Sequence, residues 1–148
     1  MKKVLLYTDG ACSVNPGVGG WGAVLIFNGF EKRISGAEPE TTNNRMELKA
    51  VIEGLKCLKE SCEVHIFSDS AYVVNAFRNG WIYSWEESKF KKADNKAVLN
   101  ADLWRQLLAL TRQHKVEFIK VKGHADNEYN NICDKLATEA VKNFKSGL

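Results

Sequence analysis

Residues 21–37 read WGAVLIFNGFEKRISGA, a stretch in which Asn28-Gly29 separates an apolar run from a more polar one. An Asn-Gly pair readily adopts the positive φ angles of a tight turn, so the stretch predicts a β-hairpin. The apolar run at residues 4–7 predicts an earlier strand, and the turn-rich residues 13–20 connect it to the hairpin. We therefore expect three consecutive strands in an antiparallel meander.

The hydrophobic period changes after the hairpin. Between residues 42 and 58 the apolar side chains recur at helical spacing: Leu48, Val51, Ile52, Leu55 and Leu58. Further elements are predicted as strands at 64–67 and 116–121, and as helices at 71–77, 103–111 and 132–144. A meander followed by alternating strands and helices predicts an α/β fold, with a mixed five-stranded sheet and helices packed on both faces.

The composition is that of a soluble globular protein. The chain has 148 residues, of which 45% are apolar and 26% charged, and its net charge is +3. This length fits a single domain over residues 1–148. The mild positive charge permits a polyanionic partner without requiring one. The first apolar run is too short for a signal peptide, and no stretch approaches the roughly 20 apolar residues of a membrane span, so we expect a cytoplasmic protein.

The cysteines do not predict a zinc site. Cys12, Cys57, Cys62 and Cys133 form no CxxC pair, and no histidine stands beside them at zinc-ligand spacing. We expect them to be buried, reduced thiols, as in a reducing compartment.

Four acidic residues lie far apart in the sequence, each at the edge of a segment predicted to be core: Asp9, Glu47, Asp69 and Asp134. Asp9 and Asp69 each follow a predicted strand, and ligands of open α/β sheets collect at the carboxyl ends of strands. Glu47 and Asp134 project to the margins of the apolar faces of their predicted helices. Carboxylates gathered in this way lose water and repel one another, and divalent cations relieve both effects. The four therefore predict a metal site.

Each acid also has a purely structural interpretation. Asp9 could be a turn residue, and Asp69 could cap the helix that follows it. Glu47 could form a capping box with Asn44, and Asp134 could belong to a surface ion pair. The residues taken singly leave these alternatives open, but a shared position at one edge of the sheet favours the metal site.

Five segments occur in order along the chain: YTDGACSVNPGVGGWG, TTNNRMEL, SDSAYV, NADLW and VKGHADNEYNNICDKLA. Together they resemble ribonuclease H of type 1 in its bacterial single-domain form, over the range from Val4 to about Ala140. The resemblance implies an RNase H-like fold. It also implies an endoribonuclease that hydrolyses the RNA strand of RNA–DNA hybrids, leaves 3′-hydroxyl and 5′-phosphate ends, and has no base-sequence specificity.

The resemblance implies a two-metal-ion mechanism as well. The family's metal-ligating carboxylates fall on Asp9, Glu47, Asp69 and Asp134. These hard oxygen ligands suit two Mg²⁺ ions, with Mn²⁺ as a substitute. His124 matches the family's mobile histidine, which assists proton movement or product release, and the ordinary pKa of histidine suits that role. We expect a monomer with no obligate protein partner.

The resemblance further implies contacts to the hybrid. Asn15, Asn43 and Asn44 would offer amides along the groove, and Thr42 and Asn100 would bind a phosphate of the DNA strand. A protrusion would add aromatic and basic contacts from Trp81, Trp85, Phe90, Lys91 and Lys92. For Trp81 a core position is equally open, and Trp104 is expected in the core.

Three sites depart from the family pattern, namely Glu86-Glu87 in the protrusion, Ala71 and Glu40. They predict weaker and more salt-sensitive hybrid binding. Two other functions remain open, a hybrid-binding module without activity and a relative that resolves DNA junctions or integrates DNA. Cleavage of a hybrid, compared with duplex DNA and duplex RNA, separates the three.

Overall fold

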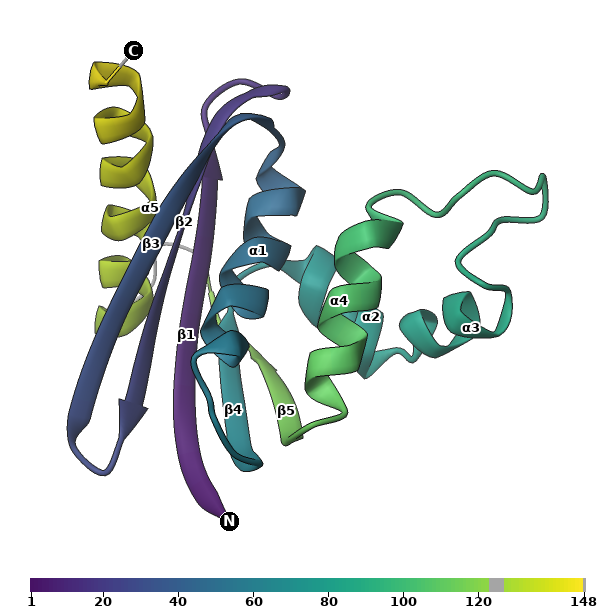
Figure 1. Cartoon of the computed structure of the whole chain (residues 1–148), viewed down its shortest axis with the longest axis horizontal. Coiled ribbons are helices and arrows are strands. Elements are labelled where there is room, and N and C mark those ends of the chain that lie inside the picture. Colours follow the sequence, from purple (N-terminus) through teal and green to yellow (C-terminus); the bar gives the residue numbers. More distant parts are fainter. Residues whose placement is uncertain (123–126, 148) are drawn as a thin grey trace.

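The structure is a computed structural model that describes residues 1–122 and 127–147. Figure 1 shows α1 and α4 on one side of a twisted sheet and α5 on the other. The elements of the described residues are, in order, β1 (Lys2–Cys12), β2 (Gly17–Phe27), β3 (Phe30–Thr41), α1 (Asn43–Lys56), β4 (Cys62–Ser68), α2 (Ala71–Arg78), α3 (Trp81–Glu87), α4 (Ala101–Thr111), β5 (Lys115–Lys120) and α5 (Glu128–Ser146).

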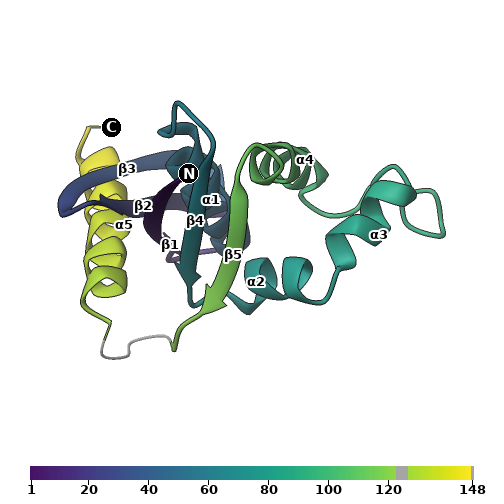
Figure 2. The same ribbon diagram turned by 90° about the horizontal axis from the view of Figure 1, so that it is seen from below.

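The five strands form one mixed sheet in the order β3-β2-β1-β4-β5. β1, β2 and β3 pair antiparallel, whereas β4 runs parallel to both β1 and β5. Asn28 and Gly29 form the predicted turn, with φ angles of 51° and 86°. α5 packs on β1, β2 and β3 from one face, and α1 covers β1 and β2 from the other (Figure 2). The predicted five-stranded architecture with helices on both faces is thus confirmed.

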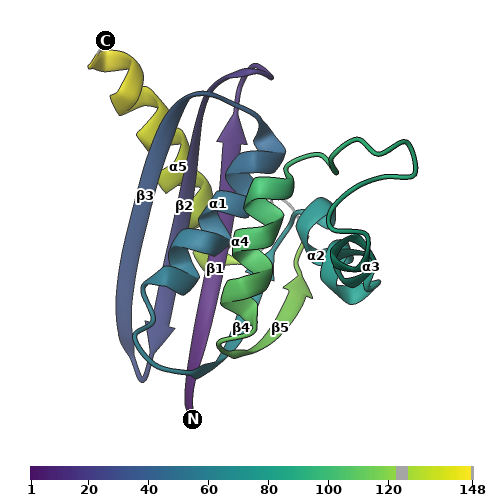
Figure 3. The same cartoon turned by 45° about the vertical axis from the view of Figure 1, so that its right-hand side comes forward.

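The main core lies between α1 and the sheet. The apolar face predicted for α1 is buried there, because Leu48, Val51, Ile52 and Leu55 are at most 1% exposed. α4 packs beside α1 (Figure 3) and extends this core through Trp104, which is fully buried as expected. Burial of these large side chains is the main source of stability for this layer.

The glycine-rich start of β2 corrects the sequence analysis, which assigned residues 13–20 to a turn. Gly17 to Gly20 already belong to β2, and α5 packs directly on the backbone of this strand. A Cβ atom added to Gly20 would lie 2.3 Å from the carbonyl oxygen of Ala137, and one on Gly22 would lie 2.5 Å from that of Cys133. These glycines therefore allow close helix–sheet packing, a long-range requirement that has no local signal.

All four cysteines are free, as expected. Cys62 and Cys133 are buried, whereas Cys12 and Cys57 are only partly so, which corrects the expectation for those two. Among the described residues, we find no helix with the length and apolar content needed to cross a membrane.

Candidate active site

The sequence suggested that Asp9 follows the first strand. In the structure Asp9 lies inside β1. β1 pairs with β4 as far as Tyr7, opposite Phe67, but stays paired with β2 through Cys12. The two parallel strands therefore separate just before Asp9. Asp69 follows directly after the end of β4, at the same opening in the sheet. The separation creates the space into which both aspartates project.

Glu47 reaches this opening from α1 because the helix crosses very close to β1. A Cβ atom on Gly10 would lie 2.5 Å from the backbone nitrogen of Glu47 and 2.6 Å from the carbonyl carbon of Met46. Only glycine allows this approach without displacing the helix. Glu47 is 5% exposed, so a carboxylate is held in the interior beside Asp9.

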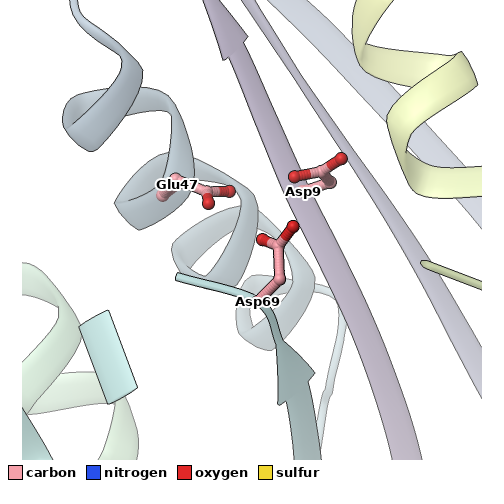
Figure 4. A group of neighbouring side chains, drawn as sticks. All are labelled: Asp9, Glu47 and Asp69. Atoms are coloured by element: carbon pink, nitrogen blue, oxygen red, sulfur yellow. The ribbon is translucent and has the colours of Figure 1, made fainter. Parts of the chain in front are cut away.

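Three carboxylates converge at the opening. Asp9, Glu47 and Asp69 each offer an oxygen, and these oxygens lie within 4.8 Å of one another. Figure 4 shows the three side chains directed toward a common point from β1, α1 and the end of β4. Asp134, which is exposed on α5, is not one of these three, but it approaches from the opposite helix layer closely enough for its charge to act on Asp9.

Burial and mutual repulsion make the ionised carboxylates of the cluster unfavourable. Burial, followed by the charges of Asp69 and Asp134, raises the pKa of Asp9 from 3.8 to about 7. Burial and the charges of Asp9 and Asp69 likewise raise the pKa of Glu47 well above its ordinary value. Each shift means that the ionised form is disfavoured until a positive charge arrives.

The donor atoms fit hard divalent cations. The Oε1 atom of Glu47 is buried and has no hydrogen-bond partner among the described residues. A buried, unpartnered carboxylate oxygen is unfavourable, and a cation would satisfy it. Burial also raises the pKa of the Cys133 thiol, and among the described residues the group that could hold a metal ion contains carboxylates alone. The cluster therefore suits hard divalent cations.

The structural interpretations of three acids are wrong. The N-cap of α2 is Ser70, whose hydroxyl accepts a hydrogen bond from the backbone N–H of Val73, so Asp69 is not the cap. α1 is capped by Thr42, and Glu47 lies beyond the capping-box position. Asp9 is in a regular strand and not in a turn.

Asn130 is a residue of this site that the sequence analysis missed. Its side-chain amide donates to the carbonyl oxygens of Thr8 (3.4 Å) and Phe67 (3.3 Å), on the two strands that separate at the opening. Asp134 lies one turn further along the same face of α5. Asn130 therefore fixes the helix that carries Asp134 to the strands that carry Asp9 and Asp69. Its spacing of four residues from Asp134 was the available signal.

The predicted groove residues lie together near the start of α1. The Oδ1 atom of Asn15 accepts from the backbone N–H of Asn43 at 2.9 Å, and Asn15, Asn43 and Asn44 are all exposed. Asn100 is bonded to Arg45, the N3 residue of α1, at 3.2 Å. The structure thus brings the groove and phosphate candidates to one surface.

The protrusion divides into buried and exposed residues. Trp81 is 48% exposed, and Lys91 and Lys92 are exposed. Trp85 packs against Trp104 at 5.3 Å between ring centroids. Phe90 is 5% exposed and is covered by the guanidinium of Arg105, so its ring faces the core, which corrects its assignment as a nucleic-acid contact.

Glu86 does not add free negative charge to the protrusion. Its carboxylate is paired with both terminal nitrogens of Arg112 at the end of α4, at 2.5 and 2.7 Å. The pair lowers the pKa of Glu86 and raises that of Arg112. Glu87 is exposed, and no partner for its side chain is found in residues 1–122 and 127–147. The departure from the family pattern at this point is therefore smaller than expected.

Of the three histidines, His124 lies outside the described residues. His114 accepts a hydrogen bond from the backbone N–H of Cys62 at 3.1 Å, which fits the structural role expected for it. His65 lies on the sheet between Glu63 and Glu117, at 3.9 and 3.7 Å.

Known proteins resemble this chain over almost its whole length. The family model for RNase H matches residues 1–142. A ribonuclease H of Thermoanaerobacter sp. is 61% identical over 94% of this chain and 90% of its own length. A ribonuclease H of Acetivibrio thermocellus is 58% identical over 96% of this chain and 97% of its own length.

Solved structures agree. LC9-RNase H1, a type 1 RNase H with the type 2 active-site motif, superimposes with a TM-score of 0.85 at 28% identity, over 96% of this chain and 73% of that one. The N-terminal RNase H domain of a Mycobacterium tuberculosis protein gives a TM-score of 0.74 at 26% identity, over the full length of both. The resemblance inferred from the sequence is confirmed: this chain belongs to the ribonuclease H family and is a nuclease.

Proposed function

We propose that this chain hydrolyses the RNA strand of RNA–DNA hybrids at a site for two divalent cations. The preferred cation would be Mg²⁺, and Mn²⁺ could substitute for it. The products would carry 3′-hydroxyl and 5′-phosphate ends, and cleavage would not depend on base sequence. The observation that carries the proposal is the convergence of Asp9, Glu47 and Asp69 within 4.8 Å, with the charge of Asp134 also acting on Asp9. The enzyme would act as a cytoplasmic monomer with a single domain over residues 1–148.

The four carboxylates would hold the cations. The oxygens of Asp9, Glu47 and Asp69 already lie together, and the charge of Asp134 acts on Asp9 from α5. When bound, such a pair of cations activates a water molecule and stabilises the leaving oxygen of an in-line displacement. Asp9 would lie at the centre of the residues that hold the cations, because the charges of both Asp69 and Asp134 act on it. His124 would carry a proton at the edge of the site.

The substrate assignment draws on the exposed amides beside the site. Asn15, Asn43 and Asn44 can donate to and accept from ribose 2′-hydroxyl groups, which distinguish RNA from DNA. LC11-RNase H1, a protein of the same fold at 22% identity, has been solved in complex with an RNA/DNA hybrid. Trp81, Lys91 and Lys92 would follow the DNA strand, and contacts to backbone and groove shape imply no base preference.

The test is a hybrid labelled on both strands, incubated with the chain in EDTA and in Mg²⁺. We expect cleavage of the RNA strand alone, only with the cation, and no cleavage of duplex DNA or duplex RNA. Binding without cleavage in excess Mg²⁺ would show that the chain is a hybrid-binding module without activity. Cleavage of DNA would indicate a DNA-processing relative. Glu139→Gln, which changes an exposed carboxylate on α5, is the matched control and should cleave like the wild type.

A further inference from the structure

The segment between α3 and α4 extends away from the sheet (Figure 1) and begins with an unusual turn. Its first two residues after the C-cap of α3, Lys89 and Phe90, both have φ 58°. This left-handed conformation is uncommon for residues other than glycine and persists where surrounding contacts hold it. The lysine loop, residues 91–97, follows directly, is exposed throughout and contains Lys91 and Lys92. The course of this loop therefore depends on the backbone of Lys89 and Phe90.

The backbone of Phe90 closes the base of the lysine loop. Its N–H donates to the carbonyl oxygen of Trp85 in α3 at 2.6 Å, and its carbonyl oxygen accepts from the N–H of Val98 at 2.8 Å. Lys91 then pairs with Ala97 in an antiparallel bridge. A rotation of the backbone at Phe90 would therefore move the whole loop, including its lysines.

Arg105 of α4 contacts both left-handed residues from a distant part of the sequence. Its Nη2 atom donates to the carbonyl oxygen of Lys89 at 3.0 Å, and its guanidinium lies 5.0 Å from the centroid of the Phe90 ring. The ring is 5% exposed and belongs to the main core, so the guanidinium packs over a fixed surface. Among residues 1–122 and 127–147 we find no carboxylate paired with Arg105, so these two contacts account for its placement.

α4 is a firm support for these contacts. Trp104, the neighbour of Arg105 in the chain, is fully buried, and the helix packs against α1. Arg112, the C-cap of α4, pairs with Glu86 and so holds α3 itself. Arg105 instead holds the turn from which the lysine loop leaves α3. The two arginines thus fix successive parts of the protrusion to one helix.

We propose that Arg105 is a positioning residue for hybrid binding, which fixes the turn at Lys89 and Phe90 and thereby the position of the lysine loop. This inference rests on the function proposed above, in which Lys91 and Lys92 follow the DNA strand. Long side chains and loops lose conformational freedom when they bind, and a loop that is fixed beforehand loses less. Arg105 would therefore act through the two lysines and not by touching the substrate.

The test is a double-mutant cycle between Arg105→Ala and the combined variant Lys91→Ala/Lys92→Ala. Dissociation constants for a hybrid are measured by fluorescence anisotropy in EDTA at low salt, where no cleavage occurs. Arg105→Ala alone should weaken binding about fivefold, the lower end of the effect expected when two long side chains must be ordered on binding. In the background without the two lysines, the same change should weaken binding by less than about twofold, because the groups that Arg105 positions are gone.

Lys59→Ala is the matched control for the loss of one positive charge, since Lys59 is exposed beyond the end of α1. Its effect on binding should be small and equal in both backgrounds. If Arg105 touched the DNA or acted through net charge alone, Arg105→Ala would weaken binding by the same factor with and without the two lysines. That additive result overturns the inference, and so does unchanged binding by Arg105→Ala.

Steady-state cleavage in Mg²⁺ gives a second readout. Arg105→Ala should raise KM about fivefold and change kcat by less than about twofold, because the carboxylate cluster is left intact. A general structural effect of the substitution would instead lower kcat as strongly as it raises KM, and that result also overturns the inference.

The two proposals fail in different ways. If the wild type binds the hybrid but does not cut its RNA strand in Mg²⁺, the proposed function fails, whereas the binding cycle still tests Arg105. If the wild type cuts the RNA strand and the cycle is additive, only the inference on Arg105 fails.

Discussion

The carboxylate cluster and the polar network around Tyr72, which includes Arg45, Asn100 and Trp104, are built in opposite ways. In the network, Arg45 is paired with Asp102, and the side-chain nitrogens of Asn100 and Trp104 both donate to the hydroxyl oxygen of Tyr72. In the cluster, Asp9, Glu47 and Asp69 face one another, and Glu47 Oε1 has no partner among the described residues. The first arrangement is stable as folded, whereas the second is unfavourable until a positive charge is added. The difference indicates that the cluster, and not the network, requires cations.

The largest expected effect comes from removing one charge of the cluster. Asp9→Asn or Asp69→Asn should lower the cleavage rate in Mg²⁺ by about three orders of magnitude or more, because a cation ligand is lost. Asp9→Asn should also raise the free energy of unfolding in EDTA at pH 7.5 by about 1–3 kcal/mol, since repulsion is relieved. Single-turnover cleavage and urea unfolding measure the two effects. A near-native rate in either variant would show that the ligand assignment is wrong.

The cluster should also make stability depend on pH when no metal is bound. Between pH 3.8 and about 7, folded Asp9 holds a proton that the unfolded chain has released. Folding then takes up a proton, so the free energy of unfolding should fall as pH rises through this window, by about 2–4 kcal/mol from Asp9.

Urea unfolding in EDTA at a series of pH values measures this dependence. Asp9→Asn is the reference that lacks the contribution of Asp9. The raised pKa of Glu47 acts in the same direction and remains in the variant. A difference between wild type and Asp9→Asn that does not change with pH would contradict the electrostatic account.

Asn130 tests how the cluster is held together. Asn130→Ala removes the amide that bonds Thr8 and Phe67, so Asp134 should lose its fixed position relative to Asp9. We expect kcat to fall about tenfold with little change in KM, because a small misplacement of a catalytic group has effects of this order or larger. Asn143→Ala, an exposed change on the same helix, is the control. An equal loss in the control would indicate a general effect on α5.

The smallest expected effect lies in the protrusion. Glu87→Lys should lower KM about twofold at low salt, and the gain should vanish as salt screens the added charge. Glu86→Gln instead breaks an exposed pair with Arg112, a change expected to cost at most about 1 kcal/mol of stability. Steady-state kinetics over a salt series distinguish them. An unchanged KM for Glu87→Lys at low salt would count against the protrusion as a binding surface.

The sequence predicted the elements and the acids well where the signal was local. The helical period of α1 placed Leu48 and Val51 in the core and Glu47 at the margin, and all three lie there. The Asn28-Gly29 turn specified the hairpin and with it the register of β2 and β3. Such features depend on neighbours in sequence, so a periodic pattern is sufficient to find them.

The errors came from contacts that are distant in sequence. Gly20 looked like a turn residue, and the close packing at Gly20 and Gly22 was missed, because nothing nearby in the sequence shows that α5 packs on them. Phe90 looked like an exposed aromatic among lysines, but Arg105 of α4 covers it. Asn130 was missed because its partners, Thr8 and Phe67, are on strands far earlier in the chain.

The most direct measurement is the melting temperature of the substrate-free wild type as a function of Mg²⁺ concentration at pH 7.5. A ligand that binds only the folded state stabilises it by mass action, so the melting temperature should rise with Mg²⁺ and keep rising through the range in which cleavage appears. Glu47→Gln, which removes one buried charge of the cluster, should show a much smaller rise. A wild-type melting temperature that does not respond to Mg²⁺ at concentrations that support cleavage would contradict the account.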